Sequence, residues 1–202
     1  MLLKSDEIVR ALSGEEGPFG RLRIVPSPSV EEIRSSGAAS VDLRLGRWFL
    51  QLREGRTALL DPSKRDRRDE ESSFPRTVFV RFGDRFILHP RKFILGITLE
   101  WFKLPPQIGG YVTGKSSWGR RGLVIETAAG IHPGFSGCLT LELGNMGEVP
   151  IALIPGMRIC QIFLHTAGEG DAVHGGQFLG RRRPTLGELA IDPVVEALAE
   201  NL

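Results

Sequence analysis

The chain has 202 residues, of which 41% are hydrophobic and 25% charged, and its net charge is +2. This length and composition are those of a globular domain with one good core. The near-neutral balance does not favour nucleic acid as a partner, and no apolar run approaches a membrane span or a signal-peptide core, which excludes a membrane protein. We expect one domain over residues 1–202, in the cytoplasm.

The N-terminal segment, residues 1–20, is predicted to contain a short helix within "KSDEIVRALSG". Ser5 can cap this helix, acidic residues fill its first turn, and Gly14 can end it. Ile8 and Leu12 then lie on one face. This helix would pack one narrow apolar stripe against the rest of the domain.

The middle of the chain is a succession of short apolar runs bounded by Gly, Pro or Asn. In "ASVDLRLG", Val41, Leu43 and Leu45 alternate with Asp42 and Arg44, which is the period of a half-buried strand. Further strand-like runs are "TVFVRFG", "RFILHP", "KFILGITLEWFKLP", "GGYVTG", "GLVIETAAG", "GCLTLELGN", "VPIALIPG" and "RICQIFLH". Their density predicts a mainly β domain, either a barrel or a sandwich.

Two segments differ from this pattern. Residues 63–73, "SKRDRRDEESS", are predicted to be a charged, exposed insert between strands. Residues 168–202 are predicted to form a Gly- and Arg-rich arm followed by a helix in "IDPVVEALAENL". In that helix Asp192 would be the cap and Pro193 the first residue. An apolar stripe would be made by Ile191, Val194, Val195 and Leu198.

The cysteines and histidines do not form a metal-binding pattern. Cys138 and Cys160 each lie inside an apolar run, and no Cys or His residues have the spacing of a zinc site. We expect two buried free thiols in a reducing compartment, and no zinc.

The tetrapeptide "GKSS", from Gly114 to Ser117, is typical of a phosphate-binding P-loop. A P-loop leads into a helix, but here only "SSWGRRG" is left for a helix before the next strand-like run. A true P-loop is therefore not expected. A short helical turn would still present backbone N–H groups and a cation to an anion. The alternative is a surface turn with ordinary charges, and these residues leave both readings open.

The carboxylate of Glu142 lies within the strand-like run "CLTLELGN". Leu139, Leu141 and Leu143 face one way on such a strand, while Thr140 and Glu142 face the other. An acid in that position can simply face solvent. If it faces a pocket instead, it is a candidate proton shuttle. The strand pattern alone does not choose between them.

The motifs "ASVDLRLG", "GITLEWFKLPPQIGGYVTGKSSWGRRGL", "TAAGIHPGFSGCLTLELGN" and "PIALIPGMRICQIFLH" follow one another in this order. Together they resemble the dCTP deaminases of the dUTPase-like superfamily, most strongly from Leu95 to Ile162. The resemblance implies a distorted β-barrel of the β-clip type with short terminal helices. It also implies a homotrimer with active sites between subunits, and zinc-independent conversion of dCTP to dUTP and ammonia. Magnesium would be bound through the substrate triphosphate.

The resemblance also implies roles for individual residues. Glu142 matches the acid that activates water for attack on cytosine C4 and shuttles the proton. Ser116 matches the serine near the reacting carbon, and Arg120 the arginine that holds the catalytic arrangement. The family's nucleotide-contacting positions are matched by Lys115, Ser116, Ser117, Thr127, Ala128, His132, Phe135, Gln177 and Arg181.

Three departures from the family pattern matter. The turn between Leu123 and Pro133 is one residue shorter than in well-known members. His132 stands where relatives have an Asp that contacts the 3′-hydroxyl and, in the related diphosphatases, helps position the hydrolytic water; its loss argues against diphosphate hydrolysis. The arm reads "QFLGRRRPT" in place of a Lys-Tyr…Gln pattern.

Two alternatives to a simple dCTP deaminase remain. The first is a diphosphatase acting on dUTP or another nucleotide, alone or coupled to deamination. The second is a non-enzymatic nucleotide-binding regulatory protein on the same fold, which the altered arm and shortened turn favour.

Overall fold

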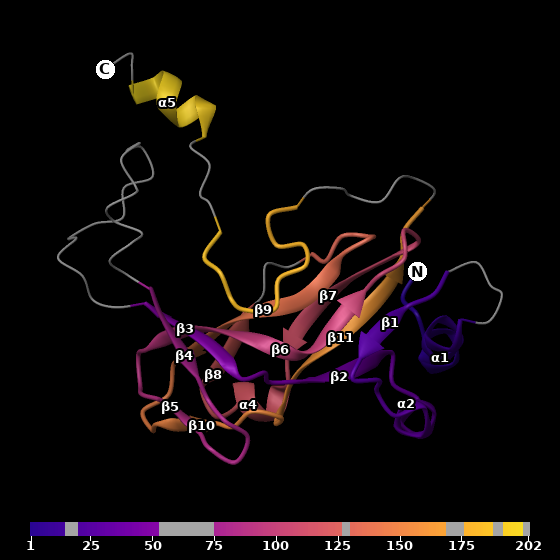
Figure 1. The fold of residues 1–202 in the computed structure, drawn as a ribbon, viewed down its shortest axis with the longest axis horizontal. Coiled ribbons are helices and arrows are strands. Elements are labelled where there is room, and N and C mark those ends of the chain that lie inside the picture. The colour runs from indigo at the N-terminus through magenta and orange to yellow at the C-terminus, as the bar shows by residue number, and fades with distance from the viewer. Residues whose placement is uncertain (15–19, 53–74, 127–129, 169–175, 188–191, 200–202) are drawn as a thin grey trace.

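The computed structural model describes residues 1–14, 20–52, 75–126, 130–168, 176–187 and 192–199. The predicted insert at residues 63–73 lies outside these ranges, and so do Thr127 and Ala128. Figure 1 shows a body of strands with short helices at its margins and a C-terminal segment that passes over β9. The mainly β class predicted from the sequence is confirmed.

The strands in the described ranges form three antiparallel sheets. The largest contains, in spatial order, β4 (Pro75–Phe79), β3 (Trp48–Leu52), β6 (Phe93–Lys103), β9 (Ser136–Asn145) and β8 (Leu123–Glu126), with β1 (Arg23–Val25) also paired to β6. A second contains β2 (Ser40–Arg44), β11 (Arg158–Thr166) and β7 (Ile108–Gly114). A third pairs β10 (Ile151–Leu153) with β5 (Phe86–Leu88). No sheet in the described part of the chain closes on itself, so the barrel stays a prediction.

Period-two alternation explains which face of each strand forms the core. On β9, Leu141 and Leu143 are fully buried, while Thr140 and Glu142 on the other face are partly exposed. On β2, Val41 and Leu43 are buried and Asp42 is not. Because residues two apart share a face, the apolar rows of the sheets meet in one hydrophobic core. The polar row of β9 is thereby turned away from that core.

The N-terminal helix, α1 (Ser5–Ser13), begins one residue differently from the prediction. Lys4 is the N-cap, and its backbone N–H donates to Glu7 Oε2 at 2.8 Å. Ser5 is the first helical residue, so the predicted Ser5 cap is wrong. Gly14 ends the helix as predicted, with a φ of 74°.

A second helix, α2 (Val30–Ser36), and the short strand β1 were not predicted. The signals for α2 were present: Ser29 caps it by accepting a hydrogen bond from the Glu32 N–H at 3.1 Å, and Gly37 ends it. The helix is short and buries only Ile33, so its sequence lacks the repeated apolar positions that reveal longer helices.

The C-terminal helix, α5 (Pro193–Ala199), begins where predicted, and Asp192 Oδ1 accepts a hydrogen bond from the Val194 N–H at 2.8 Å. Its predicted stripe does not pack, because Val194, Val195 and Leu198 are all exposed; Ile191 lies outside the described residues. None of the helices that the structure describes could span a membrane.

Both thiols are free, but only one is fully buried. Cys160 is inaccessible, whereas Cys138 is partly exposed. Burial raises the pKa of each thiol. The prediction of two buried cysteines therefore holds for Cys160 and is wrong for Cys138, which lies on the polar face of β9 with Thr140 and Glu142.

Candidate active site

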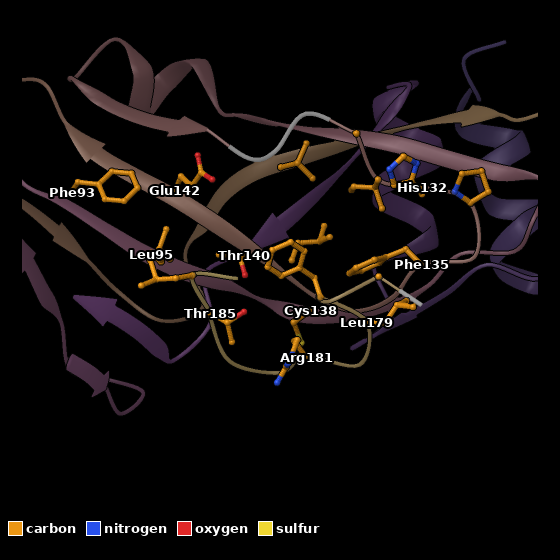
Figure 2. A pocket seen from close by; sticks show the side chains of 18 residues that line it. Phe93, Leu95, His132, Phe135, Cys138, Thr140, Glu142, Leu179, Arg181 and Thr185 are labelled. Atoms are coloured by element: carbon orange, nitrogen blue, oxygen red, sulfur yellow. The ribbon is translucent and has the colours of Figure 1, made fainter. Parts of the chain in front are cut away.

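A cavity of about 370 Å³ lies between the polar face of β9 and the C-terminal arm, residues 176–187 (Figure 2). We call it the Glu142 cavity. Besides Glu142, its lining is mostly apolar and comes from β6, β7, β9, the loop before β9 and the arm. The lining residues are Phe93, Leu95, Val112, Gly130, Ile131, His132, Pro133, Phe135, Cys138, Leu139, Thr140, Glu142, Gly176, Phe178, Leu179, Arg181, Thr185 and Leu186.

Glu142 faces this cavity because of its place in the sheet. It is paired with Leu95 of β6 on one side and with Glu126 of β8 on the other. Its sequence neighbours Leu141 and Leu143 are buried in the core on the opposite face. The question left open by the strand pattern is therefore decided by packing: the carboxylate lines a cavity.

The arm is held against β9 by backbone hydrogen bonds. The Cys138 N–H donates to the Arg181 carbonyl at 2.8 Å, and the Gly180 N–H donates to the Ser136 carbonyl at 2.7 Å. Gly137 lies beneath this contact with a φ of 144°, and a Cβ there would come within 3.3 Å of the Arg181 backbone. A glycine is needed because any side chain would be strained and would press against the arm.

The predicted site residues fall into two groups. Glu142, His132, Phe135 and Arg181 line the Glu142 cavity, with Glu142 and His132 toward opposite ends of it in Figure 2. Gln177 lies in the arm but is not among the lining residues. The second group, Lys115, Ser116, Ser117 and Arg120, is not part of this lining. One copy of the chain does not bring the two groups together.

The second group lies at the short helix α4 (Ser116–Gly119), which connects β7 to β8. Ser116, Ser117 and Arg120 are exposed. The segment "SSWGRRG" contains a helical turn of four residues, too short for the helix of a P-loop, and its contact with phosphate stays a prediction.

Lys115 is engaged by a residue from a distant strand. Its Nζ donates to both carboxylate oxygens of Asp42, on β2, at 2.6 and 2.7 Å. Arg158 Nη1 lies 3.7 Å from Asp42 Oδ2, and Arg158 also binds Glu32 at 2.8 Å. Lys115 is therefore already neutralised by a neighbour, a fact that the motif "GKSS" does not indicate.

These charged residues border a second cavity, of about 780 Å³, that also contains the buried acid Glu100. Glu100 is 5% exposed, and the Arg44 N–H donates to its two oxygens at 3.2 and 2.9 Å. Burial raises the pKa of this carboxyl, and the hydrogen bonds from Arg44 only partly oppose the effect. Ionisation of Glu100 is therefore less favourable in the folded protein than in water.

Comparison with a Glu100→Gln variant should show that ionisation of Glu100 makes the stability of the wild type depend on pH. Because the folded-state pKa lies above the ordinary value of 4.5, the carboxyl's stabilising contribution is present below that value and is lost as the pH rises through the folded pKa. Urea denaturation of both proteins at pH 4.5 and 7 checks this. We expect the free energy of unfolding of the wild type, relative to Glu100→Gln, to be lower at pH 7; an unchanged difference would contradict it.

Sequence reasoning missed several residues of the Glu142 cavity. Cys138 could have been found, because it shares the face of Thr140 and Glu142 by alternation. Phe178, Leu179, Thr185 and Leu186 carry no such signal, since the arm has no periodic pattern. No group of three or more His, Cys, Asp or Glu side chains in the described ranges is arranged to hold a metal ion.

A protein-family model described as dCTP deaminase-like matches residues 3–167. The chain belongs to this family. A relative from Dictyoglomus thermophilum is 36% identical over 198 residues, covering 95% of this chain and 96% of the relative. Another, from Corynebacterium diphtheriae, is 40% identical over 195 residues, covering 91% of this chain and 95% of the relative. Both are named "dCTP deaminase, dUMP-forming".

A solved structure supports the fold independently. The 2′-deoxycytidine 5′-triphosphate deaminase from Agrobacterium tumefaciens superposes with a TM-score of 0.58 at 22% identity. The match covers 82% of this chain and 48% of that one. At this identity the likeness concerns the fold alone.

Proposed function

We propose that this protein deaminates dCTP, with Glu142 as the group that moves the protons. One observation carries the proposal: the carboxylate at the family's catalytic motif position lines a cavity that is otherwise mostly apolar and is covered by the arm of the same chain. Its relatives, at 36% and 40% identity over nearly their whole length, are named for this activity.

In the proposed reaction Glu142 removes a proton from water as the oxygen attacks C4 of cytosine. The same carboxyl then delivers that proton to the amino group, which leaves as ammonia. One carboxylate can serve in both steps because each step restores the protonation state that the next one needs. The apolar side chains of Leu95, Phe135 and Leu139 limit the access of bulk water to this chemistry.

The separation of the two groups of predicted site residues supports an oligomeric site. Glu142 lies in the cavity, whereas Ser116 and Ser117 of α4 and Arg120, which follows α4, are exposed outside its lining. We propose that a second copy of the chain supplies these three side chains to the triphosphate and the reacting water. This arrangement agrees with the homotrimer that the sequence resemblance implies.

Within that arrangement, the donors to the phosphates would be mainly Ser116, Ser117 and Arg120, since Lys115 is paired with Asp42. Magnesium would enter with the substrate, bound to its phosphate oxygens. Arg181 and His132 would contact the nucleotide from within the Glu142 cavity, and Phe135 would pack against the deoxyribose.

The names of the relatives and the sequence analysis indicate different nucleotide products. The sequence predicted dUTP, because His132 replaces an Asp associated with diphosphate hydrolysis. The relatives' names favour dUMP, which requires a second water to release pyrophosphate. The coupled deaminase–diphosphatase is therefore the second candidate.

One assay separates these possibilities. The protein is incubated with dCTP and magnesium, and ammonia and pyrophosphate are measured separately. Ammonia with an equal amount of pyrophosphate identifies the dUMP-forming reaction, and ammonia alone identifies dUTP as the product. Binding of dCTP by calorimetry without either product would overturn the enzymatic proposal in favour of a nucleotide-binding regulator.

A further inference from the structure

The arm that covers the Glu142 cavity is mostly exposed, and Pro184 is the one buried residue among residues 176–187. Two backbone hydrogen bonds join it to β9 at Ser136 and Cys138. The side chains of Arg181, Arg182 and Arg183 are exposed. Such a segment depends on each of its remaining contacts to stay closed.

One of these contacts lies outside the cavity, on β3. The guanidinium carbon of Arg183 lies 4.1 Å from the centroid of the Trp48 ring, which is a cation–π contact. Trp48 does not line the Glu142 cavity, and no family motif quoted above includes it. Its ring is therefore available to hold the arm without touching the nucleotide.

Trp48 also contacts residues outside the arm. Its ring contacts Phe79, its partner across β3 and β4, with centroids 4.6 Å apart. The guanidinium of Arg47 lies over Phe79 at 4.4 Å and over Phe82 at 4.7 Å. These groups form a continuous series of contacts from Phe82 to Arg183, with Trp48 between Phe79 and Arg183.

We propose that Trp48 is a positioning residue for the reaction: by binding Arg183 it holds the arm closed over Glu142. A cation–π contact at a partly exposed site shifts an equilibrium by about two- to fivefold. Loss of the contact should open the arm and weaken nucleotide binding by up to that factor, while the groups around the reacting carbon stay unchanged. The kinetic part of this inference rests on the proposed deaminase function; the arm's closure does not.

Trypsin provides a readout that does not require activity, because it cleaves after Arg181 and Arg182, both in the arm. In Trp48→Leu and in Arg183→Ala we expect cleavage at these sites to be about two- to fivefold faster than in the wild type. The Trp48→Phe variant keeps an aromatic face and should stay within about twofold. The matched control is Phe82→Leu, which shortens the same series of contacts at the end that does not contact the arm, and it should behave as the wild type.

A double-mutant cycle tests whether the two residues act through each other. If they do, the Trp48→Leu/Arg183→Ala double variant is cleaved no faster than either single variant. The KM for dCTP should rise with the cleavage rate while kcat changes less. Additive effects in the double variant, or unchanged cleavage in both single variants, would overturn the role of Trp48. Faster cleavage together with no ammonia from any variant would instead refute the proposed function and leave the closure of the arm by Trp48 standing.

Discussion

Replacing Glu142 by glutamine should lower the rate of ammonia release from dCTP by at least about 10³-fold. The amide keeps the size of the side chain but can neither take a proton from water nor deliver one to the leaving amine. Glu142 is partly exposed and has no role in the core, so the thermal stability should be close to that of the wild type. Steady-state kinetics and calorimetric melting of the same preparation check both expectations.

Glu126 offers a matched control for this substitution. It is an acid on the neighbouring strand β8, directly paired with Glu142 in the sheet, and it is exposed outside the cavity lining. Glu126→Gln removes a charge beside Glu142 but leaves the proposed proton carrier in place, so it should lower kcat/KM far less than Glu142→Gln does. Turnover near the wild-type rate in Glu142→Gln would contradict the assignment of Glu142 as the group that transfers the protons.

A subunit-mixing experiment extends this prediction to the proposed shared site. Glu142→Gln and Ser116→Ala chains are each expected to be inactive alone. In mixed oligomers, the intact Glu142 of one chain can meet the intact Ser116 of the other, and activity should return. No recovery after co-refolding into verified mixed oligomers would mean that the two residues do not act together across subunits.

Replacing Asn145 by alanine should lower the free energy of unfolding more than Glu142→Gln or Glu126→Gln does. Asn145 is fully buried at the end of β9. Its side-chain amide donates to the carbonyls of Leu88 and Val149, each at 2.9 Å, and accepts from the Gly147 N–H at 3.0 Å. Alanine would leave three backbone groups without these partners, at a cost of about 3 kcal/mol. For a chain of this size the Tm should fall by about 9 °C.

The neighbouring Met146 provides the comparison, because it is 73% exposed. Met146→Ala should change the free energy of unfolding by less than about 0.5 kcal/mol. Differential scanning calorimetry of the two variants and the wild type measures the difference. A Tm for Asn145→Ala within about 2 °C of the wild type would show that water or backbone relaxation replaces the lost hydrogen bonds.

Much of the strand content was predictable because alternation is a local property. The runs around Val41 and Leu141 each have the period of a half-buried strand, and each forms one in the structure. Pro193 and Gly14 marked helix ends for equally local reasons: proline has a fixed φ and no N–H to leave unpaired, and glycine accepts a positive φ. The helix α2 was not predicted because its single buried residue, Ile33, produces no periodic apolar pattern.

The candidate site was predictable only in part. The motif pattern identified Glu142, and alternation placed Thr140 on the same face. Neither could say that Lys115 is paired with Asp42, which lies 73 residues away in the sequence. Contacts of this kind depend on which strands become neighbours, and that choice is made by the packing of the whole domain.

By itself, the sequence determined which residues of each strand share a face, and that "GKSS" could not begin a P-loop helix. Only the tertiary structure decided what covers each face. Glu142 lines a cavity rather than facing open solvent because residues of the arm, which pairs with β9 at Ser136 and Cys138, form part of the cavity wall. The physical reason is that a side chain's direction follows from the local backbone, whereas its environment is supplied by segments that are distant in the chain.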